Sequence, residues 1–185
     1  SALPFEITGC TTFTSASSGT AGTVMLSVLM LTADDCFFST ACSRPLTEGL
    51  EDAAAQAWQT GRDKLSHKPV MAFSFTPLIR QMGRAILLDA LGAACDGVPI
   101  FGTIACDPDT SEYSASNVLY EGKAYQESVA LLMVAGNFEP TFFVTSASED
   151  KIQKQKAIIT RAEGSVLMAV NDMPAKQYLR SLGLV

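Results

Sequence analysis

The chain has 185 residues, of which 48% are hydrophobic and 17% are charged. This composition supplies enough apolar side chains for a buried core and excludes an intrinsically disordered protein. The net charge of −6, from 19 acidic and 13 basic residues, argues against nucleic acid or an anionic membrane as a partner, because both require a concentrated basic face.

Neither a membrane span nor a signal peptide is predicted. The most apolar run, Val24 to Leu31, is far shorter than the roughly 20 residues that cross a bilayer. The first residues lack a basic stretch followed by an apolar one. The five cysteines are odd in number and form no CxxC pair, so free thiols in a reducing cytoplasm are expected. His67 is the single histidine and has no cysteine at zinc-ligand spacing, so no metal site is predicted.

The first part of the chain predicts a hairpin followed by a helix. Apolar residues at 24–31 and 36–38 flank Thr-Ala-Asp-Asp at 32–35, a pattern typical of two strands joined by a turn. From Thr47 to Lys64, apolar residues recur at helical spacing, and Thr47 is the predicted cap. Pro69 ends this helical pattern.

Strands and helices alternate in the middle of the chain. Residues 70–75 are expected to form a short buried strand, 79–95 an amphipathic helix and 98–102 the next strand. Asp96-Gly97 stops the helix, with Gly97 suited to a left-handed C-cap. The polar stretch 107–116 is predicted to be an exposed loop.

The remaining elements are mostly strands. Residues 117–120, 127–135 and 141–145 are predicted strands, with turns at 121–122 and 136–137. A charged connector at 151–156 leads to a strand at 166–170 and a helix at 174–182. Because this last strand and helix cannot form a core alone, we expect one domain over 1–148 and the start of a second over 149–185.

The order of elements places the chain in the α/β class, on the border of α+β. Helical crossovers between strands favour a single mixed β-sheet with helices packed on it. A layered α-β sandwich with two sheets is the alternative.

Motifs along the chain resemble those of the FIST domain family. Ile7 to Thr12 (ITGCTT) is similar to the family's Gly-Cys-Ser/Thr-Thr segment, and Val98 to Asp107 (VPIFGTIACD) to its Val-Pro-hydrophobic-hydrophobic-Gly segment. Residues 118–122 and 129–132 resemble its later strand pair. Residues 162–175 resemble the opening of the companion C-terminal FIST domain. Two departures are the absence of the family's first strand-helix unit and Asp172 at a position where glycine is commoner.

The resemblance implies an intracellular sensory domain of a bacterial signal-transduction protein. Such a domain would bind a small metabolite such as an amino acid and pass the signal to an attached output domain, for example a histidine kinase or diguanylate cyclase. It would not be an enzyme itself. Some family members resemble haem-based nitric oxide sensors, which keeps haem as an alternative cofactor, although His67 has polar neighbours unlike those of a haem ligand.

Two glycine-threonine segments are the candidate ligand site. Each follows an apolar strand, where ligands bind in open α/β sheets and glycine permits close approach of the backbone. Asp107 could bind an ammonium group, and Tyr120 could close over the ligand. The alternative is that these residues only form turns and cap backbone groups. The candidate ligand-binding residues are Gly9, Cys10, Thr11, Thr12, Gly102, Thr103, Asp107 and Tyr120.

Two other functions stay open at the level of sequence. Cys10 could be the nucleophile of a hydrolase or transferase, which would require a base beside its sulfur. A ligand-free scaffold that forms a homodimer would instead show a filled strand-end region and an apolar self-interface.

Overall fold

The structure, a computed structural model, describes residues 5–17, 19–23, 25–79, 84–106, 116–144, 157–164 and 166–183. The chain divides into two compact units, Ser1–Pro140 and Thr141–Val185. The expected charged connector at 151–156 and nearly all of the expected polar loop at 107–116 lie outside the described residues.

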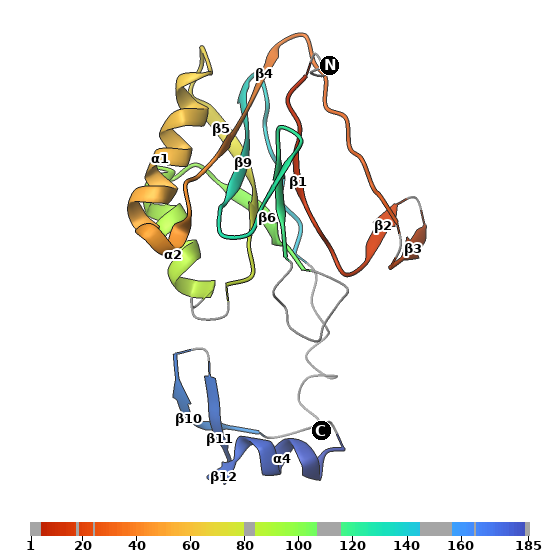
Figure 1. The fold of residues 1–185 in the computed structure, drawn as a ribbon, viewed down its shortest axis with the longest axis vertical. Helices are drawn as coiled ribbons and strands as arrows, with labels where there is room; N and C mark the ends of the chain where they lie inside the picture. Colours follow the sequence, from red (N-terminus) through yellow and green to blue (C-terminus); the bar gives the residue numbers. More distant parts are fainter. Residues whose placement is uncertain are drawn as a thin grey trace. The chain divides into compact units, whose positions relative to one another are not determined.

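A four-stranded mixed sheet forms the centre of the first unit (Figure 1). β5 runs parallel to β6, and β9 lies between β4 and β5 and is antiparallel to both. The mixed sheet predicted from the order of elements is confirmed. Its strands, in spatial order, are β4 (Cys36–Cys42), β9 (Ala130–Gly136), β5 (Pro69–Thr76) and β6 (Ile100–Ile104).

Helices α1 (Leu50–Asp63) and α2 (Arg84–Ala94) cover one face of this sheet. The inward side of α1 carries small residues, which lets the helix lie close to the sheet, where Leu131 and Met133 of β9 are fully buried. α2 belongs to the crossover between the parallel strands β5 and β6, as the alternating sequence pattern predicts.

The start of α1 corrects one sequence prediction. Thr47 does not cap the helix; it lies in a short 3₁₀ turn, Leu46–Glu48, and its hydroxyl donates to the Glu127 carboxylate at 2.8 Å. Gly49 is the N-cap residue instead.

A second sheet packs on the opposite face of the central sheet. It consists of β1 (Thr8–Cys10), β7 (Val118–Tyr120) and β8 (Lys123–Tyr125), all antiparallel. Cys10 and Val118 pack against Ala130 and Phe75 of the central sheet. The prediction of a single sheet is therefore wrong. The first unit is a layered α-β sandwich with two sheets, which was the alternative prediction. The expected later strand pair is also divided, because β7 and β9 belong to different sheets.

The predicted hairpin of residues 24–31 with 36–38 does not form. Residues 25–35 contain no strand, whereas β4 pairs with the distant strand β9. The other edge of β4 binds two side chains: the Thr40 N–H donates to the Glu6 carboxylate and the Thr40 C=O accepts from Lys64. Residues 141–144, expected to begin a strand, have no regular structure either. A short hairpin, β2 (Ser15–Ser17) with β3 (Thr20–Gly22), precedes residues 25–35.

The described residues of the second unit form a small sheet and a helix. These elements are β10 (Ile159–Glu163), β11 (Val166–Val170), β12 (Met173–Pro174) and α4 (Ala175–Ser181), of which β11 and α4 were predicted. Asn171 and Asp172 both have positive φ, 50° and 61°, in the turn between β11 and β12. Asp172 therefore adopts the left-handed conformation that glycine adopts most easily.

Candidate functional site

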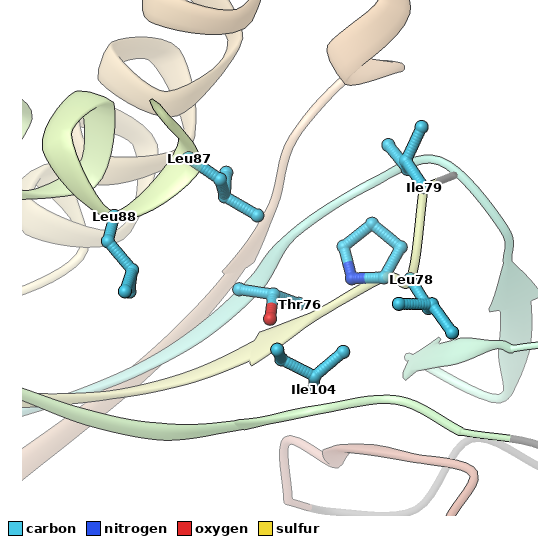
Figure 2. A pocket seen from close by; sticks show the side chains of 7 residues that line it. Thr76, Leu78, Ile79, Leu87, Leu88 and Ile104 are labelled. Carbon is cyan, nitrogen blue, oxygen red and sulfur yellow. The ribbon is translucent and has the colours of Figure 1, made fainter. Parts of the chain in front are cut away.

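A pocket opens where the parallel strands β5 and β6 end (Figure 2). The ends of parallel strands are the common ligand site of α/β sheets, because the chain leaves each strand there in a loop. The pocket has a volume of about 50 Å³. It is lined by Thr76, Pro77, Leu78, Ile79, Leu87, Leu88 and Ile104.

The pocket wall is almost wholly apolar because its one hydroxyl is already bonded. Thr76 Oγ1 donates to the Thr103 carbonyl at 3.2 Å across the β5–β6 pair. Leu87 of α2 is 7% exposed and closes the inner side, whereas Leu88 is 62% exposed. The wall can therefore bind an aliphatic group by burial of apolar surface, but it offers no charged group to a ligand.

Backbone hydrogen bonds fix the strand ends around this pocket. The Ala105 N–H donates to Thr76 O at 2.7 Å, which joins the end of β6 to the end of β5. The Leu78 N–H donates to the buried Ser116 hydroxyl at 3.1 Å, which ties the segment after β5 to the start of β7. The pocket is thus held by several segments that are distant in sequence.

The two glycine-threonine segments meet at this rim. The Cys106 N–H donates to Thr11 O at 3.0 Å, which brings the end of β6 beside the end of β1. Thr11 is itself bound to Asn117: its N–H donates to Asn117 O and its hydroxyl accepts from Asn117 N, each at 2.9 Å. The ends of both predicted segments therefore lie together.

The predicted residues themselves mostly serve the backbone. The Thr12 hydroxyl donates to Thr14 O at 2.8 Å, within its own turn. A Cβ at position 102 would lie 2.2 Å from Ser74 O, so Gly102 permits the close approach of β6 to β5. Gly9 has open space beside it, and Thr103 is exposed. None of these residues lines the pocket, and Asp107 lies outside the described residues.

Tyr120 lies at the other end of the β1–β7 pair, opposite Thr8. Its hydroxyl is 3.4 Å from Lys64 Nζ, and Lys64 also forms an ion pair with Glu6 at 3.1 Å. Burial raises the pKa of Tyr120, and the nearby Lys64 ammonium only partly offsets this effect. Tyr120 thus belongs to a polar cluster with Glu6, Thr40 and Lys64, not to the strand-end rim.

Cys10 has no feature of an activated thiol. It is half-buried against Val118 and Ala105, and this burial raises the pKa of its thiol. The single imidazole, His67, stacks on Phe37 with ring centroids 4.5 Å apart and shares a hydrogen bond with Ser66. Within the described residues, the Cys10 sulfur has no hydrogen-bonding base, which a nucleophile would require.

The other cysteines are also free thiols, as the sequence predicted. Burial raises the pKa of Cys42 to about 11 and that of Cys95 to about 12. In the part of the chain that the structure describes, no group of three or more histidine, cysteine or acidic residues is placed to hold a metal ion.

The sequence analysis missed the pocket lining because it searched for polar residues. The relevant signal was the apolar Pro-Leu-Ile run at 77–79, directly after a strand, together with Leu87-Leu88 in the following helix. Apolar residues at a strand end are rarely separable from core residues by sequence alone.

Comparison with protein families identifies the fold's relatives. The model of the FIST N domain matches residues 1–173. This chain belongs to the FIST family. FIST domains are sensory domains of signal-transduction proteins, and the family is not itself catalytic. The match spans the first unit and continues into the second.

Searches of the curated proteins and of the solved structures gave no significant match to this FIST domain. No helix in the described ranges combines the length and the apolar character that a membrane crossing requires.

Proposed function

We propose that this FIST domain senses a small metabolite with an aliphatic side chain, such as leucine, isoleucine or valine, in the cytoplasm. The strand-end pocket holds the aliphatic group, and the bound state is passed to an output domain attached to the same protein. The observation that carries this proposal is the apolar pocket at the carboxyl ends of β5 and β6.

Size and chemistry favour an aliphatic group. A volume of about 50 Å³ is several times what one water requires, and well below the roughly 150 Å³ cavity that admits benzene. A branched side chain of three or four carbons suits this space. Its burial against Leu87 and Ile104 supplies the affinity, while the charged amino and carboxylate groups of the metabolite stay at the open mouth.

The position of α2 offers a route for the signal. Leu87 and Leu88 come from α2, which also contacts α1. A ligand that binds one placement of α2 more tightly than another shifts the population between them, and an attached domain can respond to that shift.

Thermal denaturation with single amino acids tests this proposal. We expect millimolar leucine, isoleucine or valine to raise the melting temperature, because a ligand that binds only the folded state stabilises it by mass action. Glycine, serine and glutamate should leave it unchanged. A full-length protein whose melting temperature responds to none of the three aliphatic amino acids would count against the proposal.

A matched pair of variants on α2 locates the site. Leu88→Glu places a carboxylate at the pocket mouth and should abolish the shift caused by leucine. Ile86→Glu is the control, because Ile86 is similarly exposed on the same helix, at 55%, and does not line the pocket. Equal responses of the two variants to leucine would place the binding elsewhere.

A further inference from the structure

Residues 25–31 form an exposed apolar segment between the β2–β3 hairpin and β4. Leu26, Val28, Leu29 and Met30 are 86%, 78%, 76% and 74% exposed. Scattered apolar residues are normal on a protein surface, but consecutive ones in a single extended stretch mark a contact site.

Within the part of the chain that the structure describes, the backbone groups of this segment are also unpaired. Residues 25–33 make no backbone hydrogen bond to another described residue. Among the described residues, a side-chain hydrogen bond joins Ser27 Oγ of the segment to Ser15 Oγ at 2.5 Å. Unpaired N–H and C=O groups beside apolar side chains are the template on which another strand adds.

Charge is absent from this whole region of the sequence. Residues 7–33 contain no aspartate, glutamate, lysine or arginine, although the chain carries a net charge of −6. Natural edge strands usually carry charges that prevent pairing between molecules. Two copies of this acidic chain can therefore approach each other at this uncharged stretch with little repulsion.

The adjacent strand β4 is not the partner of this segment. Both outward backbone groups of Thr40, in the middle of the β4 edge, are bonded to Glu6 and Lys64. Asp35, which enters β4, is held from the β9 side by Asn137 through a backbone and a side-chain hydrogen bond. The middle of the outward edge of β4 is thus occupied at Thr40, and β4 pairs with β9 rather than with residues 25–31.

We propose that residues 25–31 pair antiparallel with the same residues of a second copy of the chain, forming a symmetric homodimer. A two-fold axis at Val28 places it opposite the partner's Val28, and Leu26 opposite the partner's Met30. Because side chains alternate along a paired strand, these three apolar residues of each copy share one face of the new ribbon. The pairing satisfies the backbone groups of the segment and buries Leu26, Val28 and Met30 of the two copies together.

Sedimentation velocity of the full chain tests the dimer. The protein concentration should span roughly 1–200 µM, the order of magnitude at which interfaces of this kind dissociate. The wild type should sediment with twice the single-chain mass at the upper concentrations. Val28→Lys puts two ammonium groups opposite each other on the axis and should weaken dimerisation at least about 100-fold. Ile86→Lys, at an exposed position on α2, should leave it unchanged. A monomeric wild type at every concentration, or unaltered dimerisation of Val28→Lys, would overturn the proposal.

Mild oxidation of Val28→Cys gives a second readout. Cross-strand neighbours lie about 4.5–5.5 Å apart between Cα atoms, within the range of a disulfide. This variant should form a covalent dimer, whereas Ile86→Cys and the wild type, with its five native thiols, should not. Equal cross-linking of Val28→Cys and Ile86→Cys would contradict the proposed axis. If the wild type binds a different protein through residues 25–31 and does not self-associate, the homodimer proposal is overturned.

Discussion

At the scale of single residues, a half-buried ion pair joins the layers of the first unit. Glu6 precedes β1, Thr40 lies in β4 and Lys64 follows α1. Burial alone would raise the pKa of Glu6, but hydrogen bonds from the Thr40 hydroxyl and N–H and from the Lys64 ammonium outweigh it. The pKa of Glu6 is therefore lowered from its ordinary value of 4.5.

This pKa predicts how stability depends on pH. Glu6→Gln should lower the free energy of unfolding by about 1 kcal/mol at pH 7, because the charged hydrogen bonds are lost at a half-exposed site. A lowered carboxylate pKa stabilises the fold above its unfolded value and loses that effect as pH falls through its folded value. The difference between wild type and variant should therefore shrink below pH 4.5.

Urea denaturation between pH 3 and 8 measures this difference. Glu139→Gln serves as the control, because Glu139 is an exposed carboxylate in the same unit. A wild-type advantage over Glu6→Gln that stays constant down to pH 3 would show that the carboxylate charge is not responsible.

At the scale of elements, regular local patterns were predicted well and pairings were not. The helices and β5 follow from apolar periodicity, and Asp96-Gly97 adopts the left-handed stop that the sequence indicates. The run at 24–31 has the composition of a strand, but residues 25–31 pair with no described strand, and β4, their expected partner, pairs with β9. Composition cannot show which strands pair, since pairing depends on the tertiary arrangement of strands that are distant in sequence.

The candidate site shows the same division. The meeting of the β1 and β6 ends was predicted, because strand ends of a layered sheet share a rim. The side chains that line the pocket, such as Leu88 and Ile104, were not predicted. Leucine and isoleucine are also the usual residues of a hydrophobic core, so the sequence did not mark them as pocket residues. Whether Gly9, Thr11 or Thr103 contacts a ligand stays a prediction.

A glycine at the junction of β9 and β4 tests the strand packing. Gly136 has φ of 96°, and a Cβ there would lie 2.4 Å from Asp35 O. That carbonyl cannot move freely, because it accepts from Asn137 N. Gly136→Ala should therefore cost at least about 2 kcal/mol of unfolding free energy, through backbone strain and steric overlap.

Gly97 provides the matched comparison for this substitution. It also has a positive φ, 77°, but nothing lies within 4 Å of a Cβ built there. Gly97→Ala should cost only about 1 kcal/mol, from the conformation alone. Equal destabilisation of the two variants in denaturant titrations would mean that the contact with Asp35 adds nothing.

At the scale of the whole molecule, the sensory role depends on one location. The family identifies a sensory domain, and we propose that the first unit binds its ligand in the pocket at the ends of β5 and β6. The proposed dimer segment, 25–31, contributes no residue to that pocket. Binding and self-association can therefore be tested separately.

Methyl NMR of the full-length protein during titration with leucine tests the central claim most directly. The methyl signals of Leu87, Leu88 and Ile104 should shift with saturation, because these side chains line the pocket. Those of Ile86 and Leu119, which do not line it, should remain in place. Saturable shifts confined to other methyl groups, or no shift at millimolar leucine, would contradict binding at the ends of β5 and β6.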